Sequence, residues 1–249
     1  MARIALFFNL WFLSFTIQAQ LIQANAPYLP EQQHLMAELL VSFEVQAPIP
    51  STATEAWSAW STVPNFTFGK DRGHMVMIND LDALHPYFRE KVKQLIVLCR
   101  AKGIELAVVE TYRTHAKQNE YKSMGKKYTR SGGGKSKHQY GLAVDVVPVL
   151  DSVAQWHDTR LWKKIGTVGE QLGLRWGGRW RSLYDPGHFE WTGGLSGNQL
   201  SSGYAPHLPK TFNSQCIEEE LAQLEESWQA WEAEQATSAR QTTASVKSN

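Results

Sequence analysis

The chain has 249 residues and a formal net charge of +1, with 43% hydrophobic and 20% charged residues. This composition is typical of a globular protein and excludes a collagen, a wholly disordered chain and a polytopic membrane protein. The small net charge argues against a nucleic-acid-binding protein that depends on bulk positive charge. Two cysteines, Cys99 and Cys216, are too few for a disulfide framework or a cysteine-type zinc site, and their spacing leaves open whether they pair.

The first residues predict a secretory signal peptide. A short basic start precedes the apolar run Ile4–Ile17, which is short for a membrane span of ~20 residues. Small and aliphatic residues lie at and before Ala19, so we expect residues 1–19 to be cleaved, after which no integral membrane segment remains. The mature protein is therefore expected to be secreted or periplasmic.

Residues 20–69 form a lead-in that contains several prolines, and clear patterns of helices and strands begin at about position 80. Pro86 opens a helix whose apolar residues recur at helical spacing until Gly103 ends it. Helices mixed with short strands predict an α+β domain with a small antiparallel sheet flanked by helices. The further segments are two apolar runs that suit buried strands, Ile104–Val109 and Tyr140–Val149, and two helices, Thr114–Met124 and Asp158–Leu172.

The C-terminal extension, residues 196–236, contains an acidic amphipathic helix. Its apolar seam covers about two heptads, and self-association through this helix is one interpretation. The acidic residues of the tail lie on this helix, so residues 20–215 carry 22 basic against 17 acidic residues, a net charge of +5. This excess favours an anionic polymer as ligand, although a solvated basic surface also accounts for it. Residues 237–249 are small and polar and predict a disordered tail. The seam residues are Ile217, Leu221, Leu224, Trp228 and Trp231.

Two stretches contain residues that suit a catalytic zinc site: SKHQYGLAVD at 136–145 and WGGRWRSLYDPGHFEW at 176–191. A catalytic zinc takes three protein ligands and a water, and a nearby carboxylate that is not a ligand can accept a proton from that water. From spacing alone, we favour the alternative that His138 is a surface histidine and Asp145 an aspartate that caps a strand. The second stretch adds a third ligand, His188, and a candidate base, Asp185, three residues before it.

The pattern S-x-H-x-x-G-x-A-x-D followed by W-G-G-x-W-x-S-x-x-D-x-x-H-F resembles the zinc peptidases of bacterial cell walls. These are the VanY-like D-alanyl-D-alanine carboxypeptidases and the L-alanyl-D-glutamate endopeptidases, whose fold is shared with the hedgehog signalling domain. The resemblance runs from about Asn79 to Trp191 and implies a zinc peptidase domain over residues 70–195. It implies Zn²⁺ held by His138, Asp145 and His188, with Asp185 as the general base.

The resemblance also implies roles in substrate binding. Arg113 would bind the substrate and stabilise the developing oxyanion, since a tetrahedral intermediate needs a fixed donor; a structural salt bridge is the alternative. Ser136 is implied as a substrate contact, and Trp176 either walls the cleft or packs in the core, as does Trp180. The chain departs from the endopeptidase pattern at residues 179 and 187, where arginine replaces the usual acidic residue and glycine the usual proline.

The implied function is a secreted, cell-wall-associated metallopeptidase that hydrolyses peptidoglycan stem peptides. We favour the L-alanyl-D-glutamate bond, because Asp185 is shorter than the glutamate base of the carboxypeptidase relatives and Gly187 is not aromatic. D-alanyl-D-alanine carboxypeptidase is the alternative. Two other classes are a zinc-containing binding module without catalysis, which the complete set of ligands, base and arginine argues against, and a cell-wall scaffold whose acidic tail binds a partner.

Overall fold

The computed structural model of the chain describes residues 60–210, 212 and 217–247. The predicted signal peptide, most of the lead-in and Cys216 lie outside the described residues. Cys99 is fully buried in a helix and forms no disulfide within the described residues. Within the described ranges, none of the helices combines the length and the apolar character that a membrane span requires.

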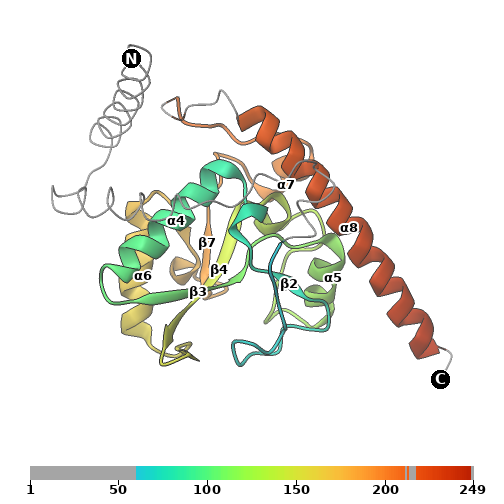
Figure 1. The fold of residues 1–249 in the computed structure, drawn as a ribbon, viewed down its shortest axis with the longest axis horizontal. Helices are drawn as coiled ribbons and strands as arrows, with labels where there is room; N and C mark the ends of the chain where they lie inside the picture. The colour runs from blue at the N-terminus through green and yellow to red at the C-terminus, as the bar shows by residue number, and fades with distance from the viewer. Residues whose placement is uncertain (1–59, 211, 213–216, 248–249) are drawn as a thin grey trace, which may run out of the picture. The chain divides into compact units, whose positions relative to one another are not determined.

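Two antiparallel sheets organise the described part of the chain, and the larger one positions the site (Figure 1). The larger sheet has the strand order β3-β4-β7-β6, and β5 pairs with the end of β4. This arrangement, with helices packed beside it, confirms the predicted α+β fold with a small antiparallel sheet. The strands are β1 (Thr62–Val63), β2 (Met77–Ile78), β3 (Glu105–Glu110), β4 (Ala143–Leu150), β5 (Val153–Ala154), β6 (Arg175–Trp176) and β7 (His188–Glu190).

The helices begin where the sequence supplies caps. Proline occupies the first turn of α4, and the Thr114 hydroxyl accepts the backbone N–H of Lys117 at the start of α5, at 3.1 Å. The Asp158 carboxylate caps α6 by accepting two backbone N–H groups, at 3.0 and 2.9 Å. The α-helices are α4 (Pro86–Arg100), α5 (His115–Ser123), α6 (Thr159–Gln171), α7 (Gly197–Ser201) and α8 (Ile217–Lys247), and the 3₁₀ helices are η2 (Leu81–Ala83), η3 (Lys137–Tyr140) and η4 (Gly177–Arg179).

The strand predicted from Tyr140 begins three residues later, at Ala143. The reason is local, because residues 137–140 form the 3₁₀ helix η3, which Gly141 ends in the left-handed conformation with φ of 61°. Glycine adopts this conformation without steric cost. The chain can therefore turn sharply into β4 directly after η3.

Helices α4 and α6 contact each other and pack against the larger sheet (Figure 1). Phe189 of β7 points toward α6, since its ring fills the space beside Gly169. Successive residues of a strand point to opposite faces, so His188 and Glu190 point to the other face. The face of the sheet opposite α6 is therefore the one that carries the candidate site.

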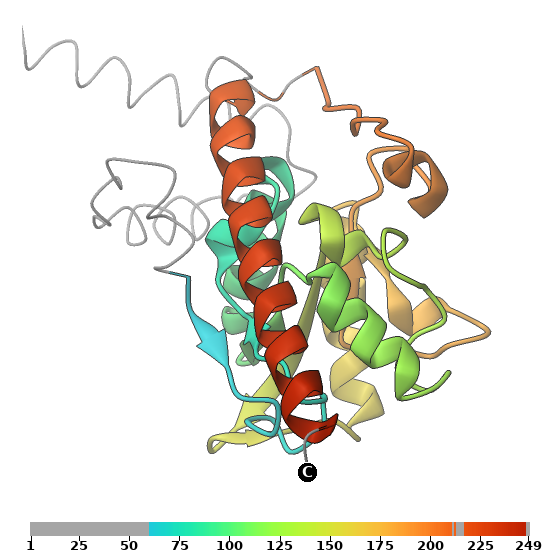
Figure 2. The same cartoon turned by 90° about the vertical axis from the view of Figure 1, so that its right-hand side faces the viewer.

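Helix α8 packs against the domain beside α5 (Figure 2). Its residues Leu224 and Trp231 are buried in one cluster with Trp60, Ile78 and Tyr112, and Trp228 packs against that cluster. The apolar seam predicted for self-association is thus covered by the domain's own residues.

Helix α8 continues through Lys247, past position 236, where the sequence predicts the start of a disordered tail. The physical reason is that elongating a helix adds one hydrogen bond per residue, whereas starting one is costly. The packed first half of α8 supplies the start. The small polar composition of the tail does not reveal this, because it lacks an apolar seam of its own.

Candidate metal centre

Neighbouring strands bring two of the predicted zinc ligands together. In the antiparallel pairing of β4 with β7, Asp145 lies directly opposite His188. On the other side of β4, Asp145 pairs with Glu110 of β3, next to an irregularity between Val108 and Glu110. The pairing therefore forms a row of Glu110, Asp145 and His188 across the sheet.

The third predicted ligand, His138, comes from η3, immediately before β4. Gly141 makes the turn between them, and a side chain at this position would collide with Trp228 and with the backbone of His85. The carbonyl oxygen of His138 accepts the N–H of Arg113 at 3.2 Å. This bond holds η3 against the segment that follows β3. The His138 side chain therefore lies beside Asp145 and His188.

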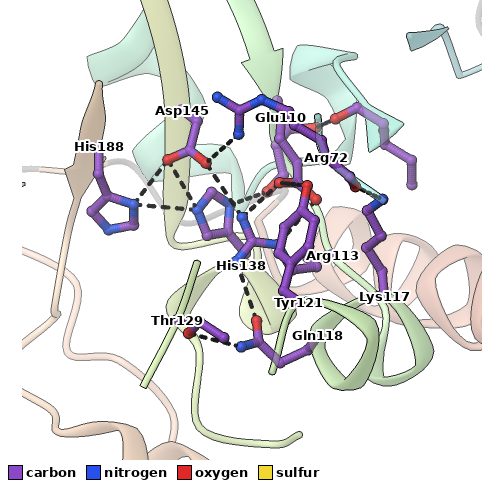
Figure 3. A network of polar contacts seen from close by, with 12 residues as sticks. Arg72, Glu110, Arg113, Lys117, Gln118, Tyr121, Thr129, His138, Asp145 and His188 are labelled. Atoms are coloured by element: carbon purple, nitrogen blue, oxygen red, sulfur yellow. Dashed lines mark hydrogen bonds and ion pairs between the residues drawn. The ribbon is translucent and has the colours of Figure 1, made fainter. Parts of the chain in front are cut away.

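The three predicted ligand side chains are buried and converge on one point (Figure 3). His188 Nδ1 lies 3.0 Å from Asp145 Oδ1, and His138 Nε2 lies 3.4 Å from the same oxygen and 3.3 Å from His188 Nδ1. All three ligand atoms lie within 4.8 Å of one another. Two imidazole nitrogens and one carboxylate oxygen are donors that zinc takes in catalytic sites, so these residues fit zinc.

Outer hydrogen bonds select the nitrogen that each histidine presents. His138 Nδ1 lies 2.7 Å from the carbonyl oxygen of Thr111, and His188 Nε2 lies 3.2 Å from Glu190 Oε2. Because these nitrogens donate to oxygen acceptors, His138 Nε2 and His188 Nδ1 keep their lone pairs for a metal. Arg175 Nη1 in turn donates to Glu190 Oε1 at 2.7 Å.

Charges fix the protonation of the buried ligands. Burial alone would raise the pKa of Asp145, but the neighbouring His138 and His188 hold that pKa well below its usual range. Burial likewise lowers the pKa of His188, yet the carboxylates of Asp145 and Glu190 outweigh burial and raise it to about 10, so a metal that binds Nδ1 must displace a proton. An ionised carboxylate between two imidazoles favours a cation at this point.

The predicted base, Asp185, opens the turn that leads into β7. Its carbonyl oxygen accepts the N–H of His188 at 3.2 Å. Gly187 passes so close to β4 that a side chain there would lie 2.7 Å from the carbonyl oxygen of Val146, so glycine suits this backbone. Burial and the charge of Asp145 raise the pKa of the half-buried Asp185 carboxyl. A raised pKa suits a group that must accept and return a proton near neutral pH.

Arg113 is buried beside the ligands and is held by surrounding side chains (Figure 3). Its Nε and Nη2 atoms donate to the two oxygens of Glu110 at 3.0 and 2.6 Å, and Nη1 donates to Gln118 at 3.2 Å. Nη2 also donates to Asp145 Oδ2 at 3.3 Å, and the Tyr121 ring lies 4.6 Å from the guanidinium carbon. Arg113 therefore combines the structural salt bridge considered from the sequence with a direct contact to a ligand.

The other predicted contact residues divide between the site and the core. Trp180 packs against the ligand His188, with ring centroids 5.0 Å apart. Trp176 is 5% exposed, and its indole N–H donates to the carbonyl oxygen of Pro186 at 2.9 Å. Of the two alternatives for Trp176, the structure has core packing. Ser136 is the half-buried N-cap of η3.

Three charged residues of the site are not indicated by the motifs: Arg72, Glu110 and Glu190. Glu190 lies two residues after His188 on the same face of a strand, a spacing that would have revealed it. Glu110 precedes Arg113 by three residues, at the end of a strand. Arg72 Nη1 lies 4.0 Å from Asp145 Oδ2 but comes from a loop far earlier in the chain, so no local signal indicates it.

Comparisons with known proteins agree with this site. Residues 129–191 match the model of a family described as D-alanyl-D-alanine carboxypeptidase, and this segment contains the three ligands and Asp185. The chain is also 28% identical over 121 residues to the peptidoglycan L-alanyl-D-glutamate endopeptidase CwlK of Bacillus subtilis (strain 168). That match covers 43% of this chain and 72% of the relative.

Two solved structures are also similar. The L-Ala D-Glu endopeptidase ChiX of Serratia marcescens matches with a TM-score of 0.38 and 27% identity over 45% of this chain and 83% of that chain. VanYB in complex with D-alanine-D-alanine matches with a TM-score of 0.35 and 20% identity over 56% of this chain and 82% of that chain. The family match and the Bacillus relative confirm the resemblance predicted from the two motifs.

Proposed function

We propose that this chain, a metallopeptidase related to the D-alanyl-D-alanine carboxypeptidases, uses zinc to cleave the L-alanyl-D-glutamate bond of peptidoglycan stem peptides. The observation that carries the proposal is the convergence of His138, Asp145 and His188, with Asp185 in the turn that leads into His188. The likeness to CwlK, which is named for this bond, supports the choice of bond. Cleavage of D-alanyl-D-alanine is the alternative, which the description of the matching family supports.

The residues of the site divide the chemistry among them. Zinc held by His138, Asp145 and His188 would polarise the scissile carbonyl and acidify the attacking water. Asp185 accepts the proton of that water and delivers it to the leaving amine. The backbone holds this base in place, because Val146 donates its N–H to the carbonyl oxygen of Gly187 in the same turn, at 2.9 Å.

Arg113 acts on the site through Asp145. Its Nη2 atom bridges Glu110 and Asp145 Oδ2, which leaves Oδ1 directed to the two histidines. The role of Arg113 in stabilising the oxyanion stays a prediction. A buried guanidinium fixed by a carboxylate suits that role, because it needs no reorganisation when negative charge develops on the substrate.

The proposed substrate also agrees with the predicted location. Peptidoglycan lies outside the cytoplasmic membrane, where the signal peptide predicted at residues 1–19 would direct the chain. The net positive charge of residues 20–215 suits the anionic stem peptide. A zinc-containing binding module without catalysis is less well supported, since Asp185 and Arg113 both accompany the ligands.

Mass spectrometry of defined peptidoglycan fragments, before and after incubation with the zinc-loaded protein, tests the proposal. We expect products that begin with D-glutamate or its amide, with L-alanine left on the muramyl residue. Asp185→Asn is the matched control, because it keeps the ligands and removes the proton acceptor. Free D-alanine as the only early product would favour the carboxypeptidase instead, and intact fragments would favour the binding module.

A further inference from the structure

A basic segment from the loop before β2 borders the metal site. Lys70 Nζ lies 3.6 Å from the centre of the Trp156 ring, and the Arg72 guanidinium carbon lies 5.3 Å from the same ring. Arg72 lies beside Asp145, with Nη1 4.0 Å from Oδ2 (Figure 3). Burial and Arg72 lower the pKa of Lys70, whereas the carboxylates of Asp185 and Asp145 act in the opposite direction. Two cations therefore lie over one tryptophan, and one of them lies beside a predicted ligand.

This segment is held in place from two sides. The indole N–H of Trp156 donates to the carbonyl oxygen of Phe68 at 2.7 Å, and the buried Lys117 of α5 donates to the carbonyl oxygen of Arg72. Trp156 also lies beside the turn that carries the base, since a side chain at Gly187 would come within 3.6 Å of its ring. The basic segment and the catalytic turn therefore pack against the same tryptophan.

Within the described residues, neither cation has all of its donors paired. Arg72 Nε is buried and has no hydrogen-bond partner among the described residues. Within that part of the chain, Asp145 alone forms an ion pair with Arg72, and its Oδ2 already accepts from Arg113 at 3.3 Å. Lys70 is exposed, and no ion pair involves it in the described ranges. An unpaired buried donor is costly, and a guanidinium binds a carboxylate through paired N–H groups.

We propose that Lys70 and Arg72 bind the free α-carboxylate of the substrate residue whose nitrogen becomes the leaving amine. This inference rests on the proposed function and names the group recognised. D-Glutamate continues the stem peptide through its γ-carboxyl group, so its α-carboxylate is free beside the L-alanyl-D-glutamate bond. A terminal D-alanine presents the same group at the same distance from its own scissile bond. Asp185 would protonate the nitrogen next to this carboxylate, and both cations lie over Trp156, which packs beside the turn that carries Asp185.

Two γ-linked peptides that differ in one group test the inference. Both contain the L-alanyl-D-glutamate bond, with the α-carboxylate either free or converted to the carboxamide. For the zinc-loaded wild type we expect kcat/KM to be about 10-fold or more higher for the acid, as for loss of a charged hydrogen bond. Arg72→Gln and Lys70→Gln should each lower this acid-to-amide ratio by reducing cleavage of the acid, with less effect on the amide. Lys163→Gln, at an exposed position of α6, is the matched control and should keep the wild-type ratio.

A second pair of peptides, ending in D-alanine or D-alaninamide, distinguishes the two sources of the carboxylate. Selectivity for the acid on this pair, without cleavage after L-alanine, would support the carboxylate site and overturn the choice of bond. Cleavage after L-alanine with equal kcat/KM for acid and amide would overturn the carboxylate site but not the proposed function. A wild-type acid-to-amide ratio of kcat/KM in both Arg72→Gln and Lys70→Gln would have the same consequence. No cleavage of any of the four peptides would overturn both. If Arg72→Gln fails to fold or to retain zinc, the exposed Lys70→Gln gives the same comparison.

Discussion

The hydrogen bond between His188 and Glu190 should determine how tightly the site holds zinc. Glu190 is 6% exposed, and its Oε2 lies 3.2 Å from His188 Nε2. In Glu190→Ala, the imidazole N–H is left buried without this acceptor, and the ring loses the contact that directs Nδ1 to the metal. Loss of such supporting partners lowers metal affinity ~10- to 100-fold, and the burial of this contact places Glu190→Ala near the upper end.

Glu190→Gln should weaken zinc binding less, by about 10-fold. The amide oxygen can still accept from His188, but the amide NH₂ group then faces Arg175 Nη1, which donates to the wild-type carboxylate at 2.7 Å. Because the Arg175 side chain is 59% exposed, it can move into solvent and avoid this clash of two donors. The remaining loss is the negative charge beside the imidazole.

Competition with a chromophoric zinc chelator measures the affinity of each folded variant. Glu170→Gln is the matched control, because Glu170 pairs with the exposed Arg179 on the surface, at 2.9 Å, and should bind zinc as the wild type does. Wild-type affinity in Glu190→Ala would refute the argument that Glu190 orients His188. Weaker binding by Glu190→Gln than by Glu190→Ala would contradict the ranking.

Four further changes test other parts of the structure. Asp185→Asn should retain zinc while kcat falls by ~10²-fold or more, and loss of zinc from this variant would make Asp185 a ligand instead of the base. Arg113→Lys keeps the charge but not the planar fork, so kcat/KM should fall at unchanged zinc content; unchanged kinetics would return Arg113 to a purely structural role. Trp228→Ala should lower the free energy of unfolding, measured in urea, by about 2 kcal/mol, because the half-buried ring stacks on Tyr112 with ring centroids 5.1 Å apart. An unchanged unfolding midpoint would mean that α8 does not stabilise the domain. Burial lowers the pKa of His85 from 6.5 to about 4, so its neutral form stabilises the fold above pH 6.5 and this contribution is lost as the pH falls toward 4. Relative to His85→Phe, the wild type should therefore lose about 3 kcal/mol of unfolding free energy over this range, and parallel pH profiles would contradict the assignment.

The sequence indicates the candidate ligands because they lie in two short motifs that resemble those of a known family. His138 and Asp145 lie on either side of one glycine turn, and a three-residue strand places His188 opposite Asp145. Zinc requires a small set of donor types, so two short motifs contain the chemistry of the site. The helices are predictable for a similar reason, because their caps lie within the helices' own first turns.

Other parts of the structure depend on contacts between distant segments and have no local signal. Arg72 reaches Asp145 only after the loop before β2 folds against Trp156. The seam of α8 has the spacing of a coiled coil, yet Trp228 donates its indole N–H to the carbonyl oxygen of Ala83 in the same chain, at 2.9 Å. Apolar spacing specifies that a helix face will be buried but not which surface buries it.

The segment that matches the family contains the predicted metal ligands and the predicted base, whereas flanking segments hold the surrounding residues. Residues 129–191 include none of the arginines that approach Asp145 Oδ2. Arg113 follows β3, and Glu232 of α8 fixes its neighbours by accepting the Tyr112 hydroxyl at 3.1 Å and the His115 N–H at 2.8 Å. Under the proposed function, the predicted metal ligands and base lie in one part of the chain and the two cations that bind the leaving residue lie in another. The Lys70 and Arg72 variants should therefore alter the choice of substrate and preserve zinc binding.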